Sequence, residues 1–374
     1  MKQNGAILII VLWFIVVVTI IVAALATETR LSAKVVIHNK NGLQQWNDTL
    51  QALRSAEMEL LINRMPDPAG EEKPVNEAEN KNEPKENKKY RFNGQVIELA
   101  YPIPDTVAVR IYDHAGKINL LRLSKKHRRQ ILENRIGNDD LAKLDALEDA
   151  WQDWIDKDDF KRVNGAEKDY YETLEPPYEP RNARLETVEE LLLIKGFDEV
   201  FKDFEITTAF TVYGSYKVNP NLATREALML VPGMDEESVN KILIKRRQKK
   251  FKSYKDFNDF LEPEQLAKFR NWINFATSRY YSIAVQVKPP TEKSDEEPDE
   301  DEDDDKQEDD EIQAQENQRA YMVTVQPRGF NQLPRILMVN PYGVLPDTSH
   351  ELMEDEEEDS EPDTAKKTSP FPFL

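Results

Sequence analysis

The sequence predicts an α+β protein in which a long N-terminal helix packs on a small antiparallel sheet, and a large all-α insertion interrupts that sheet. Three observations lead to this prediction. The chain begins with an unbroken apolar run at residues 6–26, and segments with strand periodicity lie at 90–119 and again at 280–340. Between them, 124–277 has a helical pattern punctuated by prolines. Each strand group is too small to be stable alone, so we expect both to join one sheet.

The apolar run follows a short polar leader, residues 1–5. From Ala6 to Ala26 it contains no charged residue, proline or glycine. Because a helix rises ~1.5 Å per residue, this run would span roughly 30 Å, the thickness of the hydrocarbon core of a bilayer. We therefore expect a transmembrane helix at 6–26. A cleaved signal peptide is the alternative, because Ala24-Leu25-Ala26 has the small residues of a cleavage site.

The helical pattern continues beyond the membrane run. Large apolar residues recur at helical steps, namely Leu43, Trp46, Leu50 and Leu53, followed by Leu60 and Leu61. We expect this helix, over 27–66, to pack its second half on the head, and to stop at Pro66-Asp67-Pro68. The segment 67–89 is rich in Glu, Lys, Asn and Pro, and we predict a flexible loop.

The strand segments show a period of two. Val107, Val109 and Ile111 alternate with other residues, and Asp113–Gly116 predicts the turn of a hairpin that continues into Lys117–Leu120. Further strands are expected at 280–287, 321–326 and 335–340. Together these predict an α+β module formed by residues 90–123 and 278–345.

The predicted insertion, 124–277, contains a weak internal repeat. Leu185–Glu199 aligns with Leu222–Glu236, and each copy has an apolar helix, a glycine (Gly196, Gly233) and an acid able to cap the next helix. This is a helix-hairpin-helix pattern, which either binds nucleic-acid phosphates or serves as a packing unit. A basic run follows the second copy: Lys245, Arg246, Arg247, Lys249, Lys250 and Lys252. Acids flank Gly196, which favours the packing role.

The acidity of the chain is concentrated in two segments. Residues 292–316 hold 16 acidic and 2 basic residues, and 351–363 hold 9 acidic residues and no basic one. The combined charge of these two segments, −14 and −9, is more negative than the net charge of the whole chain, −20. We predict a disordered acidic loop at 292–316 and a disordered acidic tail at 347–374, with a nearly neutral folded part. The chain has no cysteine, which excludes disulfides, cysteine-ligated zinc and a thiol nucleophile.

No catalytic constellation stands out. The four histidines are scattered, and no phosphate-binding loop, dinucleotide fingerprint or nucleophile elbow is present. We therefore predict that the protein is not an enzyme.

One acidic cluster is a candidate metal site. Asp153, Asp156 and Asp158 lie within six positions, and Glu167 follows Gly165. Closely spaced carboxylates in a glycine-containing loop offer the hard oxygen ligands that Ca²⁺ prefers, although the spacing is not that of an EF-hand. Helix capping and surface charge explain the same residues equally well.

These features together resemble the minor pseudopilin K family of type II secretion systems (general secretion pathway protein K). The resemblance covers most of residues 1–287. Besides the leader and the apolar helix, it rests on Asp113–Asn119, Asp153–Asp158, Gly165–Glu167, Pro177-Tyr178, Asn182, Glu189–Gly196 and Val218–Asn221. The two acidic segments and the extended tail lie outside the usual family pattern.

The resemblance implies a pilin-like α+β module and SAM-like repeats in the insertion. It also implies that a prepilin peptidase cuts after Gly5 and methylates the new amine of Ala6. Ile10 stands where most pseudopilins carry a glutamate, and the K family shares this departure. Structures of the family hold calcium in the insertion, which the resemblance transfers to Asp156, Asp158, Glu167 and, less closely, Asp153.

The implied function is structural. A K-type minor pseudopilin is held in the bacterial inner membrane by one span, with its head in the periplasm. It caps or initiates the tip of the pseudopilus with the minor pseudopilins I and J and the major pseudopilin, and supports protein export across the outer membrane without binding nucleic acid. The alternatives are a membrane-tethered helix-hairpin-helix DNA-binding protein and a signal-anchored enzyme.

Overall fold

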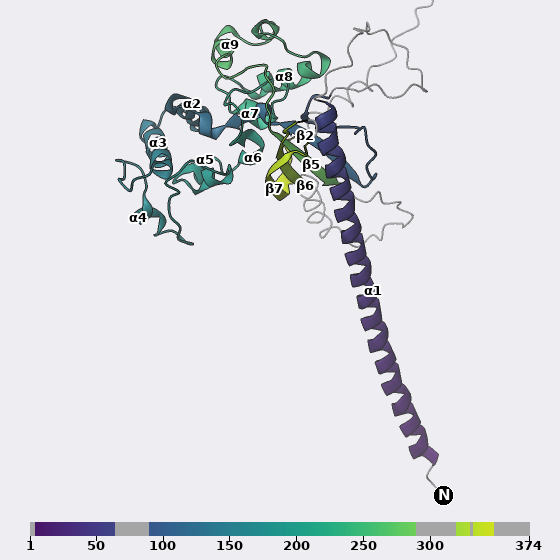
Figure 1. Ribbon diagram of the computed structural model, residues 1–374. Coiled ribbons are helices and arrows are strands. Elements are labelled where there is room, and N and C mark those ends of the chain that lie inside the picture. The colour runs from purple at the N-terminus through teal and green to yellow at the C-terminus, as the bar shows by residue number, and fades with distance from the viewer. Residues whose placement is uncertain (1–3, 64–89, 289–318, 330–331, 348–374) are drawn as a thin grey trace, which may run out of the picture.

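The structure, a computed structural model, describes residues 4–63, 90–288, 319–329 and 332–347. The predicted flexible loop 67–89, the acidic loop 292–316 and all of the tail 347–374 except Asp347 lie outside the described residues. So do residues 1–3 of the leader. Within the described part, a long helix, a five-stranded sheet and a mainly helical body follow one another (Figure 1).

The elements are spread over the whole described chain. The α-helices are α1 (Asn4–Ile62), α2 (Lys125–Ile136), α3 (Leu141–Ile155), α4 (Lys168–Tyr171), α5 (Phe197–Val200), α6 (Ile206–Ala209), α7 (Arg225–Met229), α8 (Glu236–Gln248) and α9 (Pro263–Phe269). The strands are β1 (Asn93–Val96), β2 (Val107–Asp113), β3 (Ile118–Asn119), β4 (Phe210–Thr211), β5 (Tyr281–Val287), β6 (Arg319–Gln326) and β7 (Arg335–Val344).

Helix α1 is one continuous helix that passes through Gly42 and meets the head only near its C-terminal end. Its contact face consists of Ala52, Leu53, Ala56 and Leu60, which are buried against the sheet. The two alanines let the helix backbone approach the strands closely. The predicted packing of the second half of the helix on the head is seen from Asp48 onward, and the ring of Trp46, although 44% exposed, lies edge-on with its centroid 5.3 Å from that of Tyr321. Leu43 and Leu50, 66% and 37% exposed, point away from the core. The small sheet covers only the last turns of the helix.

The five-stranded sheet has the order β1-β2-β5-β6-β7, and every pair of neighbours is antiparallel. Strand β2 pairs with β5 from Val107↔Val287 to Asp113↔Tyr281. The chain therefore leaves the sheet at the end of one strand and returns 168 positions later, at the directly opposite residue. This confirms that strands from both ends of the chain form one sheet around an insertion.

The face of the sheet that meets α1 is built by the alternating residues. Val107, Val109 and Ile111 of β2 lie beside Ile283 and Val285 of β5 in one hydrophobic core with the helix. Strand periodicity placed these side chains on one face, and burial of that face holds the helix to the sheet.

The predicted hairpin at Asp113–Gly116 does not form. A 3-10 helix, His114–Gly116, turns the chain out of the sheet, and β3 then pairs in parallel with β4 instead of returning along β2. A side chain on Gly116 would lie 2.2 Å from the carbonyl oxygen of Leu222, so this turn is packed against the insertion. The insertion thus begins at His114 rather than at residue 124, and the β3–β4 pair means that it is not all-α.

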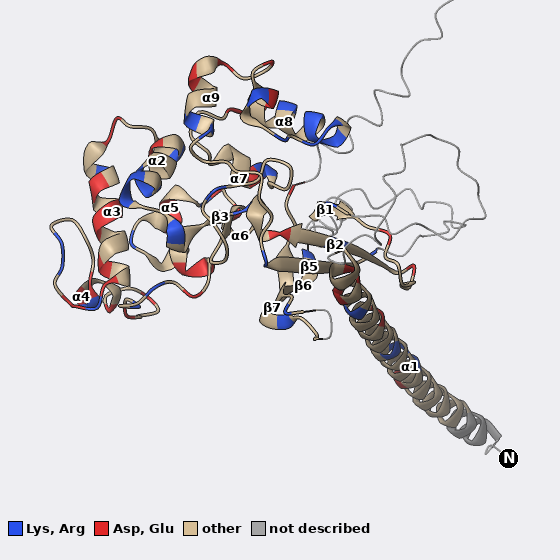
Figure 2. Cartoon of the chain, turned by 45° about the horizontal axis from the view of Figure 1, so that its top comes forward, with Lys and Arg blue, Asp and Glu red and all other residues tan. Residues whose placement is uncertain are grey.

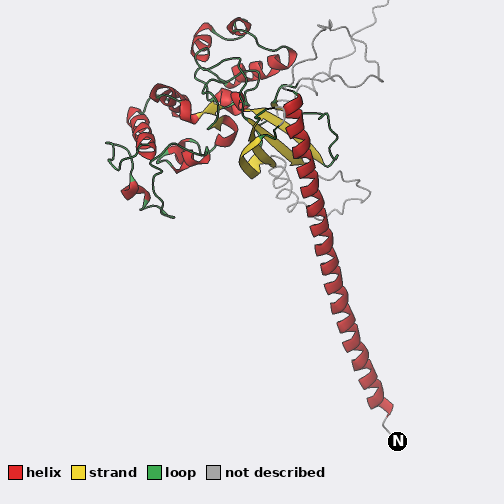
Figure 3. Ribbon diagram, in the orientation of Figure 1, coloured by secondary structure: helices red, strands yellow, loops and turns green. Residues whose placement is uncertain are grey.

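The insertion forms two groups of helices, α2–α5 and α7–α9, with α6 between them beside α7 (Figure 2), around one continuous hydrophobic core. Much of it is loop and short helix (Figure 3). Both repeat glycines adopt left-handed conformations, with φ of 81° at Gly196 and 87° at Gly233. The copies differ, however, because the first has a 3-10 helix, Glu189–Leu193, before its glycine, whereas α7 precedes the second. Whether they are helix-hairpin-helix units stays a prediction.

We expect the helix–sheet contact to dominate the stability of the head. Leu60→Ala should lower the free energy of unfolding by roughly 2–5 kcal/mol, because Leu60 is completely buried. Leu43→Ala, on the exposed part of the same helix, is the matched control and should cost under about 0.5 kcal/mol. Thermal or denaturant unfolding of the purified chain in detergent measures both. Equal losses for the two variants would contradict the packing of α1 described above.

Candidate functional site

The acidic cluster lies in the loop between α3 and α4. Asp153 is fully buried in the last turn of α3, and Asp156 caps that helix. Arg162, from the same loop, reaches back between them, with its Nη1 at 2.5 Å from Asp153 Oδ1 and 2.5 Å from Asp156 Oδ2. A side chain on Gly165 would lie 1.9 Å from Asp153 Oδ2, so glycine is required for this close approach. The loop is therefore folded around a buried carboxylate.

Glu167 is the least satisfied member of the cluster. Its side chain is 5% exposed, and neither carboxylate oxygen has a hydrogen-bond partner. Burial, together with the negative charges of Asp153, Asp156, Asp159 and Asp158, raises the pKa of Glu167 to about 7. A buried carboxylate without donors is unfavourable unless a proton or a cation compensates it. The site can thus accept positive charge beyond that of Arg162.

The structure brings together some of the predicted ligands. Asp153, Asp156 and Glu167 gather at the base of the loop, whereas Asp158 lies on its exposed part and accepts a hydrogen bond from the backbone of Phe160 at 3.0 Å. Among the described residues, no group of three or more Asp, Glu or His side chains is arranged so that it could hold a metal ion. The sequence analysis missed Arg162, although an arginine six residues from Asp156 was a visible signal.

The cluster contains further buried carboxylate oxygens that lack a hydrogen-bond partner. Besides both oxygens of Glu167, Asp156 Oδ1 is buried without a hydrogen bond. Carboxylate oxygens are the ligands that Ca²⁺ takes in proteins. Asp153, Asp156 and Glu167 are the residues that would hold such an ion, with Asp158 able to contribute from the loop.

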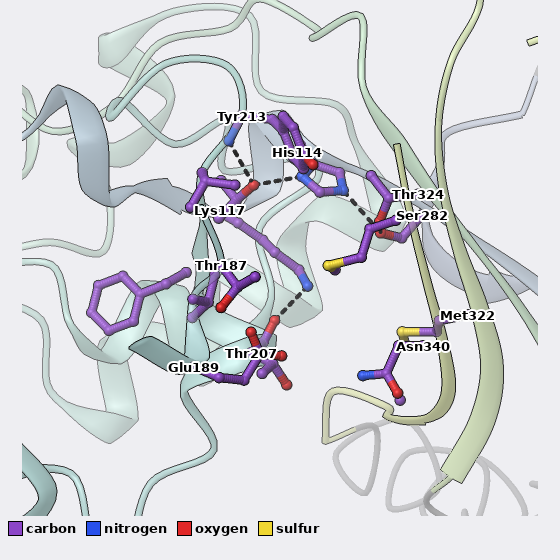
Figure 4. A pocket seen from close by; sticks show the side chains of 16 residues that line it. His114, Lys117, Thr187, Glu189, Thr207, Tyr213, Ser282, Met322, Thr324 and Asn340 are labelled. Atoms are coloured by element: carbon purple, nitrogen blue, oxygen red, sulfur yellow. Dashed lines mark hydrogen bonds between the residues drawn. The ribbon is translucent and has the colours of Figure 1, made fainter. Parts of the chain in front are cut away.

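A second polar cluster lies where the insertion joins the sheet (Figure 4). His114 bridges the two bodies: its Nδ1 is 2.6 Å from Thr211 Oγ1, and its Nε2 is 2.8 Å from Ser282 Oγ on β5. Ser282 Oγ in turn lies 3.0 Å from Thr324 Oγ1 on β6. Burial lowers the pKa of His114 to about 3, so the ring is neutral in the folded protein.

Lys117 lines the same cavity, which measures about 50 Å³. Its Nζ donates a hydrogen bond to the carbonyl oxygen of Thr207 at 2.7 Å. Burial lowers the pKa of Lys117 to about 8, and the charges of Glu226, Glu205 and Glu189 partly oppose that shift. The histidine and the lysine are thus both engaged in contacts inside the fold.

Backbone hydrogen bonds complete this junction. Asp113 accepts from the backbone N–H groups of Ala115, at 2.8 Å, and Ser278, at 3.0 Å, and so joins the exit from the sheet to the return. The backbone N–H of Asn219 donates to the carbonyl oxygen of Ala115 at 2.7 Å. The side-chain amide of Asn219 donates to the carbonyl oxygen of Ala276. Asp113–Asn119 and Val218–Asn221 therefore form one structural unit.

The basic run after the second repeat is partly internal. Arg246 is buried, and its guanidinium donates to the carbonyl oxygen of Ala223. The ammonium of Lys245 lies 5.1 Å from the ring centroid of Phe260. Lys249, Lys250 and Lys252 are exposed. The run is thus less available to phosphates than its sequence suggests.

The N-terminal helix carries the predicted anchor and processing point. Among the described residues, the stretch Leu12–Ile62 is long and apolar enough to cross a membrane, and none of its most apolar window is buried. Gly5 and Ala6 both lie within the helical backbone of α1. Cleavage between them stays a prediction.

Comparison with known proteins identifies relatives of the insertion. Residues 116–203, which include the acidic cluster, match the family model described as type II secretion system (T2SS), protein K. A stretch of 49 residues is 43% identical to type II secretion system protein K of Pectobacterium carotovorum subsp. carotovorum, and spans 13% of this chain and 15% of that protein. A solved structure, the GspK-GspI-GspJ complex from the enterotoxigenic Escherichia coli type 2 secretion system, aligns over 82% of this chain and 99% of its own, with 11% identity and a TM-score of 0.46.

We expect acid to destabilise the junction through His114. The unfolded chain protonates this histidine below its ordinary pKa of 6.5, whereas the folded chain does so only near 3. The stabilisation is therefore complete above pH 6.5 and is lost as the pH falls through this window. At pH 4.5 the loss should be roughly 3 kcal/mol relative to pH 7.5.

The measurement is the difference in unfolding free energy between pH 7.5 and pH 4.5. His114→Gln should reduce that difference, because it removes the titrating group. His38→Gln, on the exposed part of α1, should keep the wild-type difference. An unchanged pH dependence in His114→Gln would show that this ring is not the responsible group.

Proposed function

We propose, from the match of residues 116–203 to the family model of type II secretion system protein K, that the chain is a minor pseudopilin. In this proposal it is a structural component of a type II secretion system and not an enzyme. Helix α1 anchors it in the inner membrane, and the head lies in the periplasm. It assembles with the minor pseudopilins I and J at the tip of the pseudopilus and supports protein export across the outer membrane.

One observation carries the assembly role: α1 exposes apolar side chains well beyond the length that a bilayer covers. Its 59 residues correspond to roughly 90 Å, against ~30 Å for a hydrocarbon core. Beyond the predicted span, Leu31, Val35, Val36 and Ile37 are all more than half exposed. Lipid covers residues 6–26, and an apolar stripe outside the membrane calls for protein partners. In this proposal, the N-terminal helices of neighbouring pseudopilins cover this apolar stripe.

Two features favour the tip over the shaft of the filament. Ile10 replaces the glutamate that most pseudopilins place inside the apolar helix. A buried glutamate needs a partner in lipid, and a subunit without it needs no subunit ahead of it. The insertion, residues 114–280, also stands beside the sheet as a second body and would obstruct stacking along a thin fibre.

We also propose that calcium binds the acidic cluster of the insertion. The cation would be held by Asp153, Asp156 and Glu167, with Asp158 contributing from the loop. Three buried carboxylate oxygens without a hydrogen-bond partner support this, both oxygens of Glu167 and Oδ1 of Asp156, because a divalent cation converts the repulsion between such groups into coordination. The ion would be structural: it ties the end of α3 to the start of α4.

Processing of the N-terminus tests the pseudopilin assignment. In cells with a type II secretion system, mass spectrometry of the purified protein should find Ala6 as the first residue, carrying one methyl group. Gly5→Leu should block cleavage by prepilin peptidase and leave the leader attached. A mature protein that begins near Thr27 would instead indicate an ordinary signal peptide.

Co-purification tests the exposed stripe of α1. With tagged pseudopilins I and J co-expressed in membranes, Val36→Asp should reduce recovery of this chain several-fold, because it places a charge in the apolar contact. Val163→Asp is the matched control, since Val163 is 92% exposed on the insertion. Unfolding temperatures of both variants should match the wild type. Equal recovery of the two variants would argue against helix-mediated assembly.

Calcium removal tests the metal proposal. Calcium at a hundredfold excess over its dissociation constant should stabilise the head by roughly 2.7 kcal/mol relative to chelator, and magnesium should do less. The double variant Asp156→Ala with Asp158→Ala should lose this response. Arg162→Gln should enlarge it, because calcium then supplies the only cation for Asp153. Identical unfolding with calcium and with chelator would leave these acids as caps and partners of Arg162.

A further inference from the structure

A polar cleft of about 450 Å³ opens on the seam between the sheet and the insertion. Several segments that are far apart in the chain line it. Asn63 and Arg91 come from the end of α1 and the approach to β1, Lys250 follows α8, and Arg279 precedes β5. The cleft is thus placed where all parts of the head meet.

The cleft is positively charged. Arg91 uses one guanidinium N–H for the carbonyl oxygen of Arg246 at 2.9 Å. Lys250 and Arg279 are exposed, and neither forms an ion pair with another described residue. Asp113 is the acid that lines the cleft, but it is 3% exposed, and backbone N–H groups already occupy its carboxylate. Within the described part of the chain, the cleft therefore presents cations whose charge no neighbouring acid compensates.

Neighbouring cations extend this surface. Lys249 and Lys252 are exposed on either side of Lys250, and Figure 2 shows Lys and Arg positions gathered toward the end of α8. A ligand for this surface would be an extended polyanion, because the cations come from several segments, at Arg91, Lys249–Lys252 and Arg279.

The described chain ends against α7, close to the first half of α8. The backbone N–H of Asp347 donates to Glu226 Oε1 at 2.8 Å, and its carboxylate lies 3.7 Å from Arg225 Nε. Arg225 also donates to Asn240 Oδ1 of α8 at 2.9 Å. From Asn240 to Lys250 the chain advances ten residues, which is roughly 15 Å along a helix. Asp347 is therefore held within a short distance of the cleft.

An acidic segment begins immediately after this point. Three residues beyond Asp347, residues 351–363 carry 9 acids and no base. The path from Asp347 to Lys250 runs across the Arg225 side chain and then along the stretch of chain that begins at Asn240. At ~3.3 Å per residue, about eight extended residues cover it, so part of the acidic run can lie along the cleft. The short tether gives the run a high effective concentration at the cleft.

The other acidic segment is less well placed. It follows Lys288, whose backbone N–H donates to the carbonyl oxygen of Thr106 at the far end of β5. Tyr281, at the near end of β5, lines the cleft, so the whole strand, roughly 20 Å, separates that segment from it.

We propose that the cleft lined by Arg91, Lys250 and Arg279 binds the chain's own acidic tail, Glu351–Asp363. The contact is electrostatic, joins the sheet to the insertion across their seam, and excludes other polyanions from the basic surface after α8. It goes beyond the pseudopilin role and does not depend on it.

The absence of native cysteines allows a direct test by disulfide cross-linking. In the full chain in detergent, Thr277→Cys places one thiol on the exposed rim of the cleft, and Ser360→Cys places another in the tail. Mild oxidation at low salt should form an intramolecular disulfide in most molecules. At 1 M salt, where the screening length falls to about 3 Å, the yield should drop several-fold.

Charge reversal identifies the cleft as the binding surface. Lys250→Glu with Arg279→Glu should lower the cross-link yield at least fivefold. Lys126→Glu with Lys202→Glu, two exposed positions on the other group of helices, is the matched control and should leave the yield unchanged. A pair with Ser294→Cys in place of Ser360→Cys, in the acidic loop, should cross-link poorly. Equal yields from the tail and the loop, or a yield insensitive to Lys250 and Arg279, would overturn the proposal.

A second readout requires no disulfide. The thiol of Thr277→Cys alone should be alkylated several-fold faster in a chain truncated after Asp347 than in the full chain. The truncated chain should also gain salt-sensitive binding of duplex DNA, used here as a generic polyanion, because its basic surface is uncovered. Unchanged alkylation after truncation would show that the tail does not occupy the cleft.

Discussion

The head depends on one constraint: the chain must leave the sheet at Asp113 and return to it at the paired residue Tyr281. The carboxylate of Asp113 accepts N–H groups from both sides of this gap, at Ala115 and Ser278. His114 adds a buried link from the insertion to β5. Because these groups are buried, each needs its partner, and the cost of leaving one unpaired keeps the insertion in a single position on the sheet.

The N-terminal helix is stabilised by different surfaces along its length. Its last turns are buried through Ala52, Ala56 and Leu60, which the sheet covers completely. The preceding turns expose apolar side chains to the surroundings of the described chain. The hydrocarbon core of a bilayer is thick enough to cover only some of these turns. The folded monomer therefore leaves apolar area exposed, and an assembly that buries this area gains the corresponding free energy.

The head has an excess of charge at two places. The excess is negative at the α3–α4 loop and positive at the seam between the insertion and the sheet. At the α3–α4 loop, buried carboxylates exceed the one cation that Arg162 supplies, which raises the pKa of Glu167. At the seam, cations exceed the acids within reach. In both places the fold itself brings like charges together, which is unfavourable unless a counter-charge is bound. These are the positions at which a ligand contributes most to the stability of the head.

The sequence by itself determined the parts that depend on local pattern. The apolar run of 6–26, the alternation of Val107, Val109 and Ile111, and the turn glycines Gly196 and Gly233 were all readable, because burial and backbone conformation act on neighbouring residues. Only the tertiary structure decided which groups meet across long separations. His114 pairs with Ser282, β3 joins β4 instead of folding back, and Arg162 occupies the space between two predicted ligands. These contacts were not predictable, because they depend on the packing of the whole insertion against the sheet, which no single stretch of sequence encodes.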